Sequence, residues 1–162
     1  MQIRDILHNN VKEKLASDQV VASMTVRLVR GTEIARIAAT AGFDTLYVDL
    51  EHSSFSLETC SQICIAALEA GIAPLVRVPA NTPDYIARVL EGGALGVIAP
   101  HVHSADDAKA VVRAAKFAPM GERSNAVPAA RIRISSSTSA IRAGDARSIF
   151  VITKMARSTP SR

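Results

Sequence analysis

The chain has 162 residues, of which 48% are hydrophobic and 4% are aromatic, and its formal net charge is +4. This length and composition suit one globular domain whose core is built from Ala, Val, Ile and Leu, as is typical of α/β folds. The sequence contains no run of 18 apolar residues and no recognisable signal peptide. We therefore expect a cytoplasmic protein without a membrane partner.

The positive charge lies near the C-terminal end of the chain. Residues 121–162 carry eight basic and two acidic residues, whereas the first 120 residues carry 11 basic and 13 acidic ones. Because the excess charge belongs to this final segment, the sequence does not predict a nucleic-acid partner. A weaker alternative, resting on this segment alone, is a basic tail that binds anionic surfaces.

Up to about residue 120, short apolar runs alternate with segments of helical spacing. The predicted strands are residues 20–26, 43–50, 73–79 and 94–100, and the predicted helices are residues 32–42, 56–71, 82–93 and 104–119. The expected N-caps are Thr32, Ser56 and Ser104, and Gly42 and Gly71 are expected to end their helices. Four strand-then-helix units with apolar strands predict a parallel sheet covered by helices.

Two α/β architectures fit this pattern, a doubly wound open sheet and a (β/α)8 barrel. The first strand-to-helix turn, "VRLVRGTE", lacks the Gly-rich dinucleotide fingerprint, which disfavours the open sheet. We therefore expect residues 1–120 to form the N-terminal half of a TIM barrel, with about four βα units. Residues 121–162 are expected to be an irregular, poorly ordered Ser/Arg-rich tail.

Three polar residues follow the second predicted strand in "LYVDLEHSSF": Asp49, Glu51 and His52. Active sites of barrels gather at the C-terminal ends of strands. If the chain turns there, the Asp49 carboxylate can orient the His52 imidazole as a base. The alternative is a solvated turn with an exposed His, and Glu51 is then either a supporting partner or simply solvated.

Arg77 lies within "PLVRVP", on a strand that is expected to be buried. Arg is rarely buried unless it is paired, so this guanidinium is either a fork for a substrate carboxylate or a structural ion pair with Asp49 or Glu51.

The fourth predicted strand ends at His101 and His103, whose spacing places both on one face as a weak candidate metal pair. Cys60 and Cys64 lie four apart in a predicted helix and are interpreted as small core residues.

The segments "AGFDTLYVDLEHSSFSLET", "PLVRVP" and "IARVLEGGALGVIAPHVHSADDAKAVVRAAKFAPMGERS" resemble the HpcH/HpaI aldolase/citrate lyase family. More narrowly they are similar to its class II 2-keto-3-deoxy-sugar-acid and 4-hydroxy-2-oxo-heptanedioate aldolases. The resemblance covers residues 10–124 and rests on D-x-E-H, V-R-x-P and G-x-R-[GS] in that order. It implies a TIM barrel, usually a homo-oligomer, and a lyase that cleaves a 4-hydroxy-2-keto acid to pyruvate and an aldehyde.

The resemblance also implies roles for individual residues. His52 matches the catalytic base with Asp49 as its partner, Arg77 matches the Arg that binds the substrate carboxylate, and Glu51 and Arg123 are expected to contact substrate. A divalent metal, Mg²⁺, Mn²⁺ or Co²⁺, is implied as cofactor. The family holds it by a Glu of a Q-x-E motif on strand five and an Asp after strand six, and neither motif is found in this sequence.

Beyond residue 124 the sequence departs from the family pattern. The run "SIFVITK" falls roughly where strand five is expected, with Lys154 near the position of the ligand Glu. Such a change, followed by an early end, is what a frameshift, a mis-spliced exon or a truncated gene would produce. We therefore expect impaired catalysis, and the alternative is a non-catalytic half-barrel that acts as an oligomerisation module.

Overall fold

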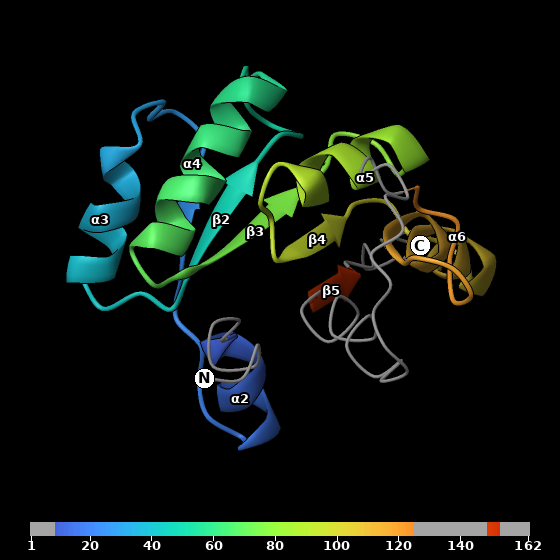
Figure 1. Cartoon of the computed structure of the whole chain (residues 1–162), viewed down its shortest axis with the longest axis horizontal. Helices are drawn as coiled ribbons and strands as arrows, with labels where there is room; N and C mark the ends of the chain where they lie inside the picture. Colours follow the sequence, from blue (N-terminus) through green and yellow to red (C-terminus); the bar gives the residue numbers. More distant parts are fainter. Residues whose placement is uncertain (1–8, 125–148, 153–162) are drawn as a thin grey trace, which may run out of the picture.

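The structure, a computed structural model, describes residues 9–124 and 149–152 (Figure 1). Its centre is a parallel sheet of β1 (Ser23–Val26), β2 (Thr45–Asp49), β3 (Ala73–Arg77), β4 (Gly96–Ala99) and β5 (Ile149–Ile152). The helices are α2 (Asn10–Ala16), α3 (Glu33–Thr40), α4 (Leu57–Glu69), α5 (Pro83–Glu91) and α6 (Ala105–Ala115).

The order of the strands decides between the two architectures that the sequence left open. The strands pair in chain order, β1-β2-β3-β4-β5, and every pair is parallel. A doubly wound sheet reverses its strand order at a switch point, whereas a barrel adds each strand beside the preceding one. The described strands therefore have the arrangement of part of a (β/α)8 barrel, as predicted.

Helices α3 to α6 form one layer outside the sheet (Figure 1). Successive helices pack against each other, α3 on α4, α4 on α5 and α5 on α6. The side of the sheet facing this layer supplies the main core, which includes Leu46, Val48, Val76 and Val97. Side chains alternate along a strand, so Tyr47, Asp49 and Arg77 point to the opposite side, which is the interior of a barrel.

The predicted helix boundaries are confirmed to within a few residues. The Ser56 hydroxyl accepts a hydrogen bond from the Thr59 N–H, and Ser104 forms a capping box with Asp107. Thr32 precedes α3, but its side chain makes no capping hydrogen bond. Gly71 has a φ of 79°, and the Ile72 N–H bonds the Ala67 carbonyl, so α4 ends in a Schellman motif.

Two elements lie outside the four predicted units. Helix α2 lies near the N-terminal ends of the strands, where the Lys14 Nζ donates to Asp44 just before β2 (Figure 1). Strand β5 pairs with β4 from Gly96↔Ile149 to Ala99↔Ile152. It lies within the "SIFVITK" run, so the sheet includes part of the segment that was set apart as a tail. Lys154 and most of residues 121–162 lie outside the described residues.

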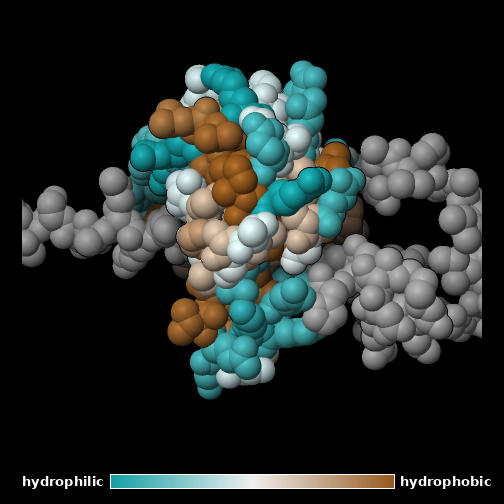
Figure 2. Space-filling model, turned by 90° about the vertical axis from the view of Figure 1, so that its left-hand side faces the viewer, coloured by the Kyte–Doolittle hydropathy of each residue, from teal (hydrophilic) through white to brown (hydrophobic). Residues whose placement is uncertain are grey.

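No helix among the described residues is long and apolar enough to cross a membrane. The face in Figure 2 carries hydrophobic side chains among hydrophilic ones. Helices α3 and α4 contribute three partly exposed large hydrophobic residues, Ile37, Ile65 and Leu68.

Candidate active site

Four polar side chains meet at the C-terminal ends of three neighbouring strands. Asp49 ends β2 and pairs in register with Arg77, which ends β3. Glu51 follows β2 after one residue, and His101 follows β4. Since parallel strands present their carboxyl ends at one rim, the fold brings together residues that are up to 52 positions apart.

Arg77 and Asp49 form a bidentate ion pair. The Arg77 Nε and Nη2 donate to the two Asp49 carboxylate oxygens over 2.9 and 2.6 Å. The Asp49 side chain is fully buried, and it also accepts hydrogen bonds from the backbone N–H groups of Glu51 and His52. Burial alone would raise the pKa of Asp49, but these donors outweigh it and lower the pKa below the ordinary value.

The Glu51 carboxylate lies between Arg77 and two imidazoles. Its Oε2 is 3.1 Å from the Arg77 Nη1 and 3.6 Å from the His52 Nε2, and its Oε1 is 2.7 Å from the His101 Nε2. The Glu51 side chain is 11% exposed, whereas the His52 and His101 side chains are 58% and 52% exposed. The Glu51 carboxylate therefore contacts the less exposed Arg77 guanidinium on one side, and the two imidazoles that it faces are exposed to solvent.

The contacts of His52 differ from the predicted pairing with Asp49. Asp49 contacts His52 through the backbone N–H, and the carboxylate nearest the His52 ring is that of Glu51. The reason is geometric, because Asp49 is the last residue of β2 and points inward onto Arg77. The turn that follows carries the His52 ring away from Asp49 and toward Glu51.

The remaining predicted site residues lie apart from this cluster or do not form a metal site. The guanidinium of Arg123 lies 4.0 Å over the Phe117 ring and lines a groove between α5 and α6. The rings of His101 and His103 stack at 6.5 Å. Among residues 9–124 and 149–152, no group of three or more His, Cys, Asp or Glu side chains could hold a metal ion. Cys60 and Cys64 are free and buried in the core, as expected.

Tyr47, which lies beside Arg77 in the site, was not predicted from the sequence. The Arg77 guanidinium lies 5.5 Å from the centre of the Tyr47 ring, in cation–π range. Burial raises the pKa of Tyr47, so its hydroxyl stays protonated at neutral pH. The alternation along β2 was a usable signal, since a residue two positions before Asp49 must share its face.

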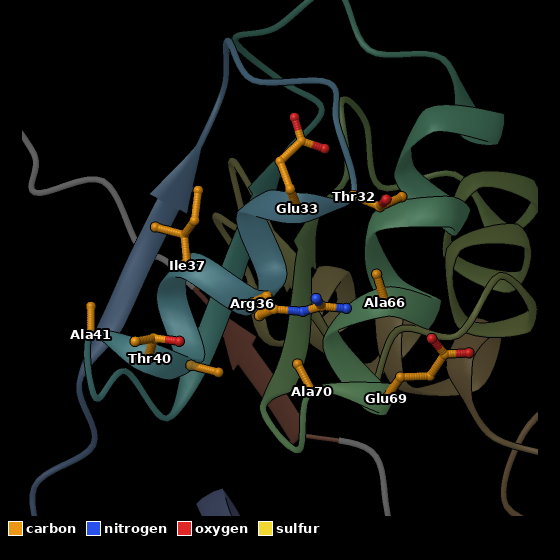
Figure 3. A pocket seen from close by; sticks show the side chains of 10 residues that line it. Thr32, Glu33, Arg36, Ile37, Thr40, Ala41, Ala66, Glu69 and Ala70 are labelled. Atoms are coloured by element: carbon orange, nitrogen blue, oxygen red, sulfur yellow. The ribbon is translucent and has the colours of Figure 1, made fainter.

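A groove larger than the one that Arg123 lines lies elsewhere in the molecule. A groove of about 770 Å³ runs between α3 and α4 and is lined by Glu33, Arg36, Ile37 and Glu69, among others (Figure 3). None of the strand-end residues lines it. We place the candidate active site at the strand ends because, within the part of the chain that the structure describes, only there do a buried ion pair and exposed imidazoles adjoin.

The HpcH/HpaI aldolase/citrate lyase family matches residues 29–154, which include the strand-end cluster and extend to β5. The chain belongs to this family. The match continues beyond residue 124, where the recognisable motifs of the sequence end. The match confirms the family that the motifs resemble, and the curated relatives below are named as aldolases, which are lyases.

Two enzymes illustrate the similarity. The 4-hydroxy-4-methyl-2-oxoglutarate aldolase of Chaetomium globosum is 44% identical over 117 residues, which are 72% of this chain and 44% of the relative. The 2-keto-3-deoxy-L-rhamnonate aldolase of Escherichia coli is 31% identical over 126 residues, or 78% of this chain and 47% of the relative. The chain thus spans about half the length of these relatives.

Solved structures of the family share the fold. The HpcH/HpaI aldolase from Desulfitobacterium hafniense superposes with a TM-score of 0.68 at 36% identity, covering 71% of this chain and 44% of that chain. A family protein from Burkholderia cenocepacia superposes with a TM-score of 0.75 at 26% identity, covering 90% of this chain and 59% of that chain.

The residues that the structure describes do not fit the divalent metal that the family implies. Both carboxylates at the rim are already occupied, Asp49 by Arg77 and two backbone N–H groups, and Glu51 by Arg77 and His101. A metal site needs oxygen ligands turned toward the ion, and these oxygens face N–H donors instead.

Proposed function

We propose that this chain contributes the keto-acid-binding rim of an aldolase that cleaves a 4-hydroxy-2-keto acid to pyruvate and an aldehyde. The observation that carries the proposal is Arg77, a guanidinium anchored by Asp49 at a strand end beside two exposed imidazoles. A planar guanidinium at a partly buried rim is suited to a carboxylate and to the negative charge of an enolate.

In the proposed reaction His52 removes the proton of the 4-hydroxyl group. The C3–C4 bond then breaks, its electron pair forms the enolate, and the aldehyde departs. The enolate takes up one proton at C3 to yield pyruvate. This proton replaces the one that His52 removed from the 4-hydroxyl group, so protons and electrons balance. Arg77 stabilises the enolate charge, and Glu51 faces the His52 ring at 3.6 Å to stabilise the imidazolium that forms.

The substrate is proposed to be a small 4-hydroxy-2-keto acid with a second carboxylate, by similarity to the fungal relative that is named for 4-hydroxy-4-methyl-2-oxoglutarate. When C4 carries a methyl group instead of a hydrogen, as in that compound, the departing product is a ketone rather than an aldehyde. From the family we also propose a divalent metal held by ligands other than the described residues, a homo-oligomeric assembly and a cytoplasmic location. Because the described residues do not form a metal site, we expect the chain by itself to bind a keto acid with little or no turnover.

The test is an NMR chemical-shift titration with oxalate, a stable analogue of the pyruvate enolate. We expect weak binding, roughly millimolar without metal. Arg77→Ala should abolish it, and Arg36→Ala, the same change on the exposed face of α3, should retain it. Equal binding by the Arg77 variant, or no binding by the wild type, would reject the proposal.

Turnover should be measured in parallel. Pyruvate release from a 4-hydroxy-2-keto acid, lost in His52→Ala, would show that this chain is a competent catalyst by itself. That result would reject the expected impairment while leaving the assigned residues in place.

A second candidate is association through β1. Two large hydrophobic side chains flank this strand and are almost fully exposed, Val20 at 88% and Leu28 at 90%. Apolar residues beside a sheet edge favour pairing with another chain. Sedimentation equilibrium would test this, since Val20→Asp and Leu28→Asp should return an oligomer to the monomer if β1 is the contact.

A further inference from the structure

His101 has a backbone conformation that few residues adopt. Its φ is 53°, in the left-handed region, where Asn, Asp and His are the commonest residues apart from Gly. In this conformation its Nε2 lies 2.7 Å from the Glu51 Oε1. A carboxylate only accepts hydrogen bonds, so the His101 Nε2 carries the proton that lies between them.

The charges at the rim show why this bond matters. Arg77 has one positive charge and faces two carboxylates, Asp49 at 2.6 Å and Glu51 at 3.1 Å. Asp49 is buried, and its lowered pKa keeps it ionised. These two carboxylates already exceed the single charge of the guanidinium, and a keto acid brings a third carboxylate to it. Besides Arg77, the Glu51 side chain faces two imidazoles, and the His101 Nε2, at 2.7 Å, is the one within hydrogen-bond distance, since the His52 Nε2 lies at 3.6 Å.

We propose that His101 is a positioning residue, which holds Glu51 and so leaves Arg77 able to receive a substrate carboxylate. The hydrogen bond from His101 offsets part of the Glu51 charge and directs one oxygen away from Arg77. Without it, Glu51 pairs more strongly with Arg77 and competes with the substrate. This inference rests on the proposed function, because it assigns Arg77 to a keto acid.

Three variants separate this role from a general structural one. His101→Asn removes the contact, since its amide is shorter, and Asn tolerates the left-handed conformation. His101→Gln retains an N–H donor that can reach Glu51. His103→Asn is the matched control, because its ring stacks on His101 at 6.5 Å while its backbone N–H bonds Asp107. Circular dichroism and melting curves verify that each variant folds.

The measurement is the same oxalate titration. We expect His101→Asn to weaken binding about fivefold, as for the loss of a typical hydrogen bond. His101→Gln should recover most of the affinity, and His103→Asn should bind like the wild type. The proposal fails if His101→Asn binds like the wild type, if His101→Gln does not recover, or if His103→Asn is equally impaired.

A second readout does not need the ligand. The Arg77 Nε–H signal in ¹⁵N spectra, assigned by its loss in Arg77→Lys, should shift in His101→Asn, return in His101→Gln and stay in place in His103→Asn. If the wild type binds no oxalate, the proposed function fails and this signal alone decides the role of His101. An unchanged signal in His101→Asn would reject the positioning role.

Discussion

Asp49 and Arg77 are cross-strand neighbours in register on β2 and β3, and their side chains form a two-point ion pair in the interior of the partial barrel. The sequence left open whether Arg77 was a substrate fork or a structural ion pair. The structure shows the ion pair, since two of its nitrogens bond Asp49 and the third faces Glu51 at the rim. The substrate-binding role of Arg77 is our proposal.

This pairing predicts a stability difference that depends on pH. Asp49→Asn leaves the partly buried Arg77 without its main counter-charge and should lower the free energy of unfolding by about 3 kcal/mol at pH 7. Urea denaturation measures this. Asp106→Asn, at an 89% exposed side chain, is the control and should change it by less than about 0.5 kcal/mol.

The pH dependence follows from the lowered pKa of Asp49. A carboxyl group with a lower pKa in the folded state stabilises the protein above its unfolded pKa, ordinarily 3.8. This contribution is lost as the pH falls through the lower folded value. The stability difference between wild type and Asp49→Asn should therefore shrink below about pH 4. A constant difference down to acid unfolding would contradict this account.

Arg77→Lys tests whether the geometry matters beyond the charge. A lysine ammonium cannot bond both Asp49 oxygens in a plane and also face Glu51. We expect a loss of about 1–2 kcal/mol in unfolding free energy and weaker oxalate binding. Arg88→Lys on α5 is the matched control. Equal stability and binding in Arg77→Lys would mean that a point charge suffices.

Gly71 supports a prediction about the scaffold. Its φ of 79° closes α4 ahead of β3, and open space surrounds the position of a Cβ. Gly71→Ala should therefore cost about 1 kcal/mol through backbone strain alone. Gly71→Asn should cost less, because Asn tolerates this conformation. Thermal melts of both variants distinguish strain from steric overlap, which would make the larger Asn the worse substitution.

The sequence predicted most of the scaffold because its signals are local. Apolar runs predicted β1 to β4, and Ser56 and Gly71 predicted the ends of α4 because capping chemistry depends on adjacent residues. The motifs predicted the family, which the family match confirms. Strand β5 was less clear, since its pairing with β4 joins residues 96–99 to residues 149–152 across a long stretch of sequence.

The partners within the site could be predicted only in part, since an ion pair of Arg77 with Asp49 or Glu51 was one of two alternatives left open by the sequence. Asp49 and His52 are three residues apart, and their spacing suggested a dyad, yet Asp49 bonds the side chain of Arg77, 28 positions away. The Glu51–His101 bond spans 50 positions. Residue types and their places at strand ends are determined by the sequence alone. Which carboxylate meets which cation is decided by strand register and by the direction of each turn, and these exist only after the strands have paired.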